Sequence, residues 1–398
     1  MTYEQWLLLL SPEGQGLLAE ISQETLTEAN HLLIAARLRE QAPPALAQAV
    51  IETVWLRQRA EEKFTRATRM YFTRPALEQA SAEIVSTHRA QRFFEIGARR
   101  VADLGCGIGG DALALAAGAE VIGLDKNLVR LAMARENIRA YGLDRRFKAV
   151  QADLLDQEPV AVDALFFDPA RRDERGRRLK SVHRYRPPLC LIEPWLQLVP
   201  DTAVKVSPAV DYAEIPTEAE SEFISVAGAV KECVFWYGDL RRGAGRRATL
   251  LPSGHSLAAG DLPQPDLQPR EPGAYLYEPD GAVIRAHLVQ QLGQLIGAAP
   301  IDAEIAYLTA DAPLDTPFAR GFAIDDWFPF QLKRLRHYLR ERGIGRVTIK
   351  KRGSPLEPAT LQSRLRLQGD EHRIVFLTHV LGAPAVLIGR AISADHSP

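Results

Sequence analysis

The sequence has few cysteines, and none is spaced to hold a metal ion or to build a disulfide framework. Its 398 residues include only Cys106, Cys190 and Cys233, which form no C-x-x-C pair. The nine histidines form no H-x-x-x-H pair. This pattern argues against a disulfide scaffold and against a zinc ribbon, and we expect no structural metal.

Long apolar runs and a net charge are also missing. No apolar run approaches the roughly 18 residues that a membrane-spanning helix needs. The N-terminal stretch MTYEQWLLLLSPEGQG has a short apolar run but no basic start, so it is a poor signal peptide. We therefore expect a soluble, cytoplasmic protein with no membrane partner. The formal net charge is −1, so only local charge can indicate a polyanionic partner.

What is present is enough apolar material for two or three domains, at 46% of the chain. Residues 1–90 have apolar residues at helical spacing and predict a helical N-terminal region. Residues 91–252 alternate β-rich and helical segments and predict the core domain. Residues 253–325 begin rich in proline and glycine and read as a linker and intermediate segment, and residues 326–398 predict an α+β domain with an antiparallel sheet.

Acidic residues follow the β-rich runs of the core. The runs VADLG, EVIGLD, FKAVQAD and DALFFDP bring Asp103, Asp125, Asp153 and Asp168 to the ends of four expected strands. Strands that alternate with helices predict a mostly parallel sheet with helices on both faces. Ligands of such sheets bind at the carboxyl ends of the strands, so we expect these four acids to lie at one binding edge.

The loop after the first strand contains three glycines in the pattern G-x-G-x-x-G, at Gly105, Gly107 and Gly110. This spacing suits the pyrophosphate of a dinucleotide and equally suits S-adenosylmethionine. Asp103, two residues before Gly105, would repel a pyrophosphate at 4–6 Å by about a few kcal/mol, and would attract an ammonium or sulfonium group. The carboxylate favours S-adenosylmethionine, and an NAD-dependent oxidoreductase stays as an alternative.

The motif series DLGCGIGGD, GLD, QAD and DPAR resembles that of class I S-adenosylmethionine-dependent methyltransferases. Within that class the chain is similar to a bacterial group with a C-terminal THUMP-like domain, related to the trimethylguanosine-synthase-like enzymes that methylate guanine N2. RPALEQASAEIVSTHRA, FDPARRDERGRR, VKVSPAVDY and VTIKKRG extend the likeness over residues 60–398.

The resemblance implies an α/β fold with a Rossmann-like, seven-stranded methyltransferase core. It also implies an N-terminal helical region and a C-terminal α+β domain of ferredoxin-like or THUMP-like form. The implied cofactor is S-adenosylmethionine and the implied partner is RNA, either rRNA or tRNA.

The residues expected to hold the donor lie at the strand ends: Asp103, Gly105, Gly107, Gly109, Asp125, Asp153 and Leu154. Asp125 would accept from the ribose hydroxyls, and Asp153 from the adenine amino group. Asp168 and Pro169 match the motif that orients an acceptor amine in amino-methylating relatives, and we expect them to be the catalytic residues. Ala170 and Arg171 replace the proline and aromatic residue that follow there, so base stacking would come from Tyr185, Phe72, Trp236 or the plane of Arg171.

Two stretches are strongly basic. Residues 171–186 hold eight basic and two acidic side chains, and residues 333–352 hold nine basic and one acidic side chain. Arginine and lysine at such density suit phosphate contacts. The side chains expected to contact substrate phosphates are Arg171, Arg172, Arg178, Lys180, Lys350, Lys351 and Arg352.

The hypothesis from the sequence is a methyltransferase that acts on a base nitrogen of RNA, with guanine N2 first. A methyltransferase of a protein or small molecule stays open as an alternative. A non-catalytic RNA-binding protein with a vestigial donor pocket also stays open.

Overall fold

The computed structural model describes residues 1–172, 177–179, 181–243, 245–260 and 265–392. Contacts divide the chain into two compact units. The first unit is Met1–Glu220 with Glu232–Arg242, and the second is Ser221–Lys231 with Gly243–Pro398. This division differs from the four segments expected from the sequence, whose boundaries stay a prediction.

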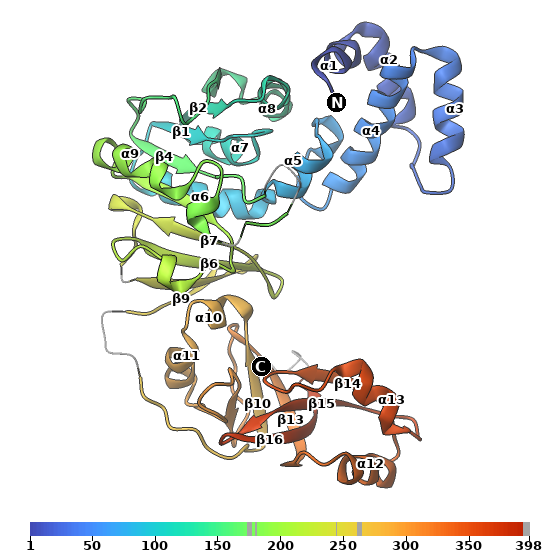
Figure 1. Cartoon of the computed structure of the whole chain (residues 1–398), viewed down its shortest axis with the longest axis vertical. Coiled ribbons are helices and arrows are strands. Elements are labelled where there is room, and N and C mark those ends of the chain that lie inside the picture. The colour runs from blue at the N-terminus through green and yellow to red at the C-terminus, as the bar shows by residue number, and fades with distance from the viewer. Residues whose placement is uncertain (173–176, 180, 244, 261–264, 393–398) are drawn as a thin grey trace. The chain divides into compact units, whose positions relative to one another are not determined.

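The N-terminal residues of the first unit form helices α1 (Tyr3–Leu10), α2 (Pro12–Ile21), α3 (His31–Gln41) and α4 (Pro44–Ala60). Prolines stand in the first turns of α2 and α4, where the lost N–H would have had no helical partner. Helices α1, α2 and α3 all pack against α4, as the blue part of Figure 1 shows. Helices α5 (Arg74–Gln79) and α6 (Glu83–Glu95) lead from this bundle to the sheet.

The sheet begins with β1 (Arg100–Leu104), β2 (Glu120–Asp125), β3 (Phe147–Gln151), β4 (Ala164–Phe167) and β5 (Thr202–Val206). These five strands pair in parallel, and β7 (Ala229–Trp236) pairs antiparallel with β5. Helix α7 (Gly110–Ala116) packs against β1 and β2, and α8 (Leu128–Ala140) packs against β2 and β3. Helix α9 (Glu193–Leu198) precedes β5. Parallel pairing brings the carboxyl ends of β1–β4 to one edge, where the four predicted acids lie.

Among the described residues the whole strand order of this sheet is β3-β2-β1-β4-β5-β7-β6-β8-β9, with β6 at Glu220–Val226, β8 at Arg246–Leu251 and β9 at His255–Ala258. The sequence-based expectation of an α/β, Rossmann-like methyltransferase core is confirmed by this topology, together with the structural relatives described below.

The second unit contains a seven-stranded sheet in the order β11-β12-β10-β13-β16-β15-β14. Its elements are β10 (Tyr275–Pro279), α10 (Gly281–Arg285), α11 (Val289–Ile296), β11 (Ala299–Pro300), β12 (Leu308–Ala310), β13 (Ala319–Pro329), α12 (Leu332–Glu341), β14 (Ile344–Lys351), α13 (Pro358–Leu365), β15 (Glu371–Val380) and β16 (Ala383–Ala391). The segment expected as linker and intermediate region, 253–325, therefore supplies β10–β12 to this sheet.

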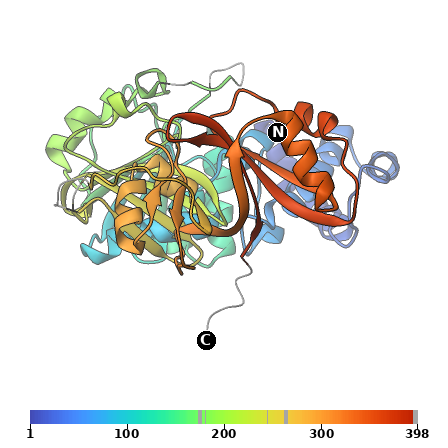
Figure 2. The same cartoon turned by 90° about the horizontal axis from the view of Figure 1, so that it is seen from below.

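Both faces of this second sheet are covered by apolar side chains that alternate along each strand. On β15, Val375 and Leu377 pack with α12 and α13, whereas Phe376 packs on the other face with Phe322. Helices α12 and α13 lie together beside β14 (Figures 1 and 2). The expectation of a wholly antiparallel sheet is wrong for one pair: β14 runs parallel to β15, because α13 connects the two strands as a crossover.

Two further structural findings concern the described residues as a whole. No helix among them is long and apolar enough to cross a membrane. In the same residues no group of three or more histidine, cysteine, aspartate or glutamate side chains could hold a metal ion.

Candidate functional site

The glycine loop follows β1 and turns with left-handed backbone angles. The φ angles of Gly105, Gly107 and Gly109 are 86°, 55° and 81°. The amide of Gly105 donates to the carbonyl oxygen of Leu124 at 2.8 Å. A Cβ atom at Gly105 would lie 3.1 Å from the backbone oxygen of Asp168. The absence of a side chain therefore lets the loop approach the end of β4 closely and leaves backbone open to a ligand.

We expect Gly105→Ala to weaken donor binding at least about tenfold, since the added Cβ meets the Asp168 carbonyl in a backbone conformation that costs about 1–2 kcal/mol for alanine. Gly142→Ala is the matched control, because Gly142 has a φ of 74° and no atom lies within 4 Å of the place that its Cβ would take. Calorimetry with S-adenosylmethionine and thermal melts would separate the two effects. Equal donor affinities in both variants would contradict a close approach as the reason for Gly105.

Three other predicted donor residues lie at the ends of β2 and β3. The buried Asp125 accepts from the backbone amides of Gly107 at 3.0 Å and Asn127 at 2.7 Å, which fixes its carboxylate beside the glycine loop. Asp153 is exposed and accepts from the amide of Leu155 at 3.1 Å. Leu154 is buried. The structure thus gathers the predicted residues at one sheet edge, and their individual roles toward a ligand stay predictions.

Asp103, at the end of β1, is 1% exposed, and within the described residues neither of its carboxylate oxygens has a hydrogen-bond donor. Burial raises the pKa of Asp103 well above its usual range, and the charges of Asp111 and Asp168 raise it further, against the opposing effect of Lys205 and Arg89. A buried carboxylate without a donor is costly and calls for an explanation. A positively charged ligand would supply the missing partner.

A chain of buried ion pairs surrounds Asp103. Lys205 on β5 lies 2.5 Å from Oδ2 of Asp168 and 4.0 Å from Oδ2 of Asp111. Arg89 on α6 pairs with Asp111 and with Glu232 on β7. Burial disfavours the charge of Asp111, but Arg89 and Lys205 outweigh burial and lower its pKa.

The charges in this cluster do not balance. Two cations, Arg89 and Lys205, face four carboxylates: Asp103, Asp111, Asp168 and Glu232. With all groups ionised, the cluster carries two negative charges in excess. Such a site attracts a cationic ligand and repels a diphosphate. The arrangement therefore favours a sulfonium donor over a dinucleotide.

Asp168 and Pro169, the predicted catalytic residues, follow directly after β4. Ala170 pairs antiparallel with Arg186 through two backbone hydrogen bonds, of 3.0 and 3.1 Å. A second bridge joins Arg172 to Arg178. We call the described residues that these two bridges join, Ala170, Arg172, Arg178 and Arg186, the basic ribbon.

Sequence relatives identify the family. The chain is 36% identical over 358 residues to an uncharacterised S-adenosylmethionine-dependent methyltransferase of Mycobacterium tuberculosis, in strain H37Rv and in strain CDC 1551. The match covers 87% of this chain and 95% of each relative. The chain belongs to the S-adenosylmethionine-dependent methyltransferases. The fold agrees with a crystal structure described as that of a candidate methyltransferase of Porphyromonas gingivalis W83, with a TM-score of 0.73 and 20% identity over 93% of this chain and 100% of that one.

Family models match three parts of the methyltransferase. Residues 98–187 match RNA cap guanine-N2 methyltransferase, and residues 319–391 match a THUMP domain-like family. Residues 2–60 match a domain of unknown function. The expectations of a THUMP-like C-terminal domain, of an enzyme and of S-adenosylmethionine as cofactor are confirmed.

The residues present fit this cofactor. The unpartnered Asp103 carboxylate and the net negative cluster suit its positive charges, and the bare backbone at Gly105 provides a surface that a Cβ would fill. Asp125 would hold the ribose through the acceptor capacity that remains beside its two amide donors. The expected cofactor and the chemistry of the site therefore agree.

The aromatic residues expected to stack on a base are not available for that role. Tyr185 is buried, and its hydroxyl accepts from the amide of Ser207 at 3.2 Å. Phe72 is buried beside Phe64 in the helical core, and Trp236 is buried at the end of β7. These three predictions were wrong, since the side chains serve packing. Arg171, half-buried with Nη1 3.5 Å from the carbonyl oxygen of Val206, is the remaining candidate.

The predicted phosphate-binding residues have different surroundings. Arg172 is half-buried and Arg178 is exposed, whereas Lys180 lies outside the described residues. In the second unit, Lys350 lies 2.5 Å and Arg352 3.6 Å from Glu278. Lys351 lies 2.6 Å from Glu357. The three cations of the second unit are therefore paired with carboxylates in the free protein.

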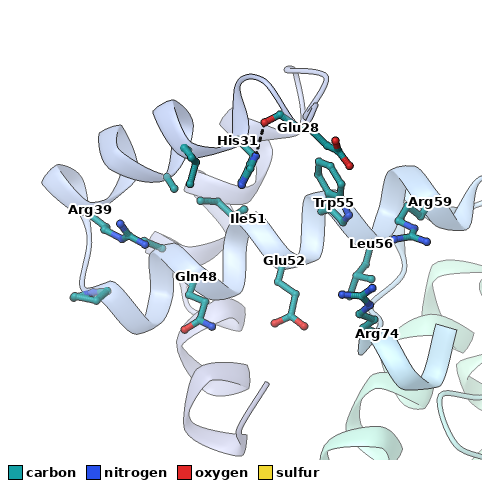
Figure 3. Close-up of a pocket in the computed structure, with 14 residues that line it drawn as sticks. Glu28, His31, Arg39, Gln48, Ile51, Glu52, Trp55, Leu56, Arg59 and Arg74 are labelled. Atoms are coloured by element: carbon teal, nitrogen blue, oxygen red, sulfur yellow. Dashed lines mark hydrogen bonds between the residues drawn. The ribbon is translucent and has the colours of Figure 1, made fainter. Parts of the chain in front are cut away.

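A separate pocket of about 1000 Å³ lies among α3, α4 and α5 (Figure 3). Trp55 and His31 stand on one side of it, and Arg59 and Arg74 stand together near Leu56. None of the strand-end carboxylates lines this pocket, so it is distinct from the donor site.

Sequence reasoning missed Lys205, Arg89 and Glu232, although each is buried at the centre of the site. The available signal was a lysine within the apolar run AVKV of β5. A lysine inside a strand that is buried along its whole length needs a partner, and the strand-end acids were the candidates.

Proposed function

We propose that the methyltransferase acts on a base nitrogen in RNA, with the exocyclic N2 of guanine as the first candidate. One observation carries the proposal: the match to the RNA cap guanine-N2 model spans both the glycine loop and Asp168-Pro169. The THUMP-like match over residues 319–391 supports RNA as the partner. RNA substrates would place the enzyme in the cytoplasm.

The division of labour follows from the positions of the carboxylates. Asp103, the glycine loop and Asp125 would hold S-adenosylmethionine, which when bound supplies an electrophilic methyl group on a positively charged sulfur. Asp168 would accept a hydrogen bond from the N–H of the acceptor, aiming its lone pair and stabilising the positive charge that develops on nitrogen. Pro169 would fix the backbone beside that contact.

Phosphate contacts would come from exposed cations. Arg178 lies on the basic ribbon of the first unit, next to Arg172 across its bridge. In the second unit the outer side of α12 carries exposed Lys333, Arg334 and Arg340. Lys350, Lys351 and Arg352 would bind phosphate only by exchanging their carboxylate partners for it.

Incubation with methyl-labelled donor and separate pools of total RNA, protein extract and metabolite extract tests the acceptor class. We expect label in RNA, and mass spectrometry of its nucleosides should show an N2-methylated guanosine. Label confined to protein or metabolites would replace the RNA proposal with the alternative acceptor.

RNA binding should also weaken steeply with salt, because each phosphate contact contributes about −0.7 to the slope of log affinity against log salt for single strands. Arg178→Ala should reduce the steepness by about one contact. Arg145→Ala is the control, since exposed Arg145 precedes β3 and therefore lies at the amino ends of the parallel strands, away from the predicted site. Equal slopes for both variants would count against the basic ribbon as an RNA contact.

A further inference from the structure

Lys205 is the one cation that bonds directly to the proposed acceptor-binding carboxylate within the described residues. It lies on β5, is 2% exposed, and its Nζ is 2.5 Å from Oδ2 of Asp168. Burying an ammonium group is costly even when it is paired, so an apolar residue would serve the packing of this strand better. The position therefore calls for a role beyond packing.

The two carboxylate oxygens of Asp168 have different surroundings, because Lys205 bonds to only one of them. Oδ2 is occupied by Lys205, and Asp168 keeps a side-chain exposure that the lysine lacks. Among the described residues, no donor other than Lys205 bonds to this carboxylate, which leaves Oδ1 open. A carboxylate with one oxygen fixed and the other open presents a single acceptor in a set direction.

Charged side chains from several elements lie around Asp168. Asp103 from β1 repels Asp168, and Asp111 from α7 shares its partner Lys205, with Oδ2 4.0 Å from the lysine Nζ. Arg89 from α6 and Lys205 from β5 oppose them, and Glu232 from β7 takes up part of the charge of Arg89. In the described part of the chain only Lys205 contacts Asp168 directly, so its removal would leave Asp168 in an excess of like charge.

We propose that Lys205 is a positioning residue, which holds one oxygen of Asp168 and turns its free oxygen toward the N–H of the acceptor. The inference rests on the proposed function in that it needs an acceptor with an N–H group. A hydroxylate acceptor would be repelled by the same oxygen. The pair thus disfavours acceptors that enter the site as oxyanions.

Lys205→Met tests the proposal in the full-length enzyme, with Lys205→Arg as the charge-conserving variant. At a pH high enough to keep Asp103 ionised in both proteins, we expect the methionine variant to bind S-adenosylmethionine within about threefold of wild type, because removing a positive charge does not weaken the attraction of the site for a cation. Its kcat should fall about 100-fold, as misplacement of an orienting group typically costs. The arginine variant should recover most of the loss, because it keeps a cation beside Asp168.

A carboxyl ¹³C signal provides a readout that needs no acceptor. The signal of Asp168, identified by its disappearance in Asp168→Asn, should be displaced in Lys205→Met relative to wild type, because the carboxylate loses the ammonium group bonded to Oδ2. If wild type leaves RNA unlabelled while this displacement is seen, the RNA proposal fails and the hold of Lys205 on Asp168 stands.

A double variant, Lys205→Met with Asp168→Asn, is the control for folding. It removes both charges and should have a higher melting temperature than the single methionine variant. A folded Lys205→Met enzyme with wild-type kcat would overturn the proposal. An unchanged carboxyl signal of Asp168 in that variant would do the same.

Discussion

Asp103→Asn is expected to bind S-adenosylmethionine about 10- to 100-fold more weakly than wild type, the equivalent of one lost charge-assisted hydrogen bond of about 1.5–3 kcal/mol. The reason is that Asp103 is buried and, in the described part of the chain, has no donor of its own. A cation is the partner that this carboxylate lacks. Calorimetry of the ligand-free enzyme with the donor measures the change.

The same substitution should stabilise the enzyme without its ligand. Burial raises the pKa of Asp103, so the folded protein holds this proton more tightly than the unfolded chain. Stability is therefore lost as pH rises from the ordinary aspartate pKa of about 3.9 through the raised folded value, and the loss persists above it. The asparagine side chain has no charge to bury, and we expect the melting temperature of Asp103→Asn at neutral pH to exceed that of wild type.

The pH dependence of donor binding shows whether the charge of Asp103 or only the shape of its side chain matters for affinity. Ionised Asp103 is the form that attracts the donor, so wild-type affinity should fall as pH drops through the raised pKa of Asp103. The asparagine variant should lack this dependence. Asp144→Asn, at an exposed acid before β3, is the matched control and should match wild type in every measurement. Wild-type donor affinity in Asp103→Asn would show that the carboxylate does not face the ligand.

Much of the donor site could be predicted from the sequence because its parts are local. Each strand-end acid lies within or directly after an apolar run, and parallel strands bring such ends to one edge. The glycine spacing of the loop is equally local, and the structure gives Gly105, Gly107 and Gly109 positive φ angles. Asp103 could be predicted as a donor-binding residue because its negative charge suits S-adenosylmethionine and repels the pyrophosphate of a dinucleotide.

The ion cluster could not be predicted in the same way, because its pairs join distant segments. Arg89 and Glu232 are 143 residues apart, and Lys205 and Asp168 are 37 residues apart. In a helical pattern Arg89 looks like a solvent-facing residue, and nothing local distinguishes it. The three aromatic predictions failed for a related reason: the same ring can stack on a base or fill a core, and only the fold decides.

The parallel pairing of β14 and β15 could have been predicted from the sequence. A helical segment stands between the two runs RVTIKK and RIVFLTHV, and strand–helix–strand connections generally give parallel neighbours. The expected antiparallel arrangement was wrong for this pair because α13 returns the chain to the end of the sheet at which β14 began.

Asp168→Ala is expected to lower kcat about 1000-fold, because it removes the acceptor that would orient the amine and stabilise its developing charge. Donor affinity should change less than about tenfold, since Asp103 and Asp111 remain. The contrast with Asp103→Asn is the informative result: one carboxylate governs donor binding and the other governs transfer. Single-turnover methylation and calorimetry on the same preparations measure both.

Asp168→Ala should also lower the stability of the folded protein, so a second substitution at the same position is needed. Removing Asp168 leaves the buried Lys205 with Asp111, at 4.0 Å, as its carboxylate partner, so the melting temperature should fall. Asp168→Asn keeps the shape and one carbonyl oxygen, and should melt closer to wild type while still losing most of the transfer rate. Asp156→Ala, at an exposed acid after β3, controls for loss of a nearby negative charge. A folded Asp168→Ala enzyme that transfers methyl groups at the wild-type rate would remove Asp168 from the reaction and with it the role assigned to Lys205.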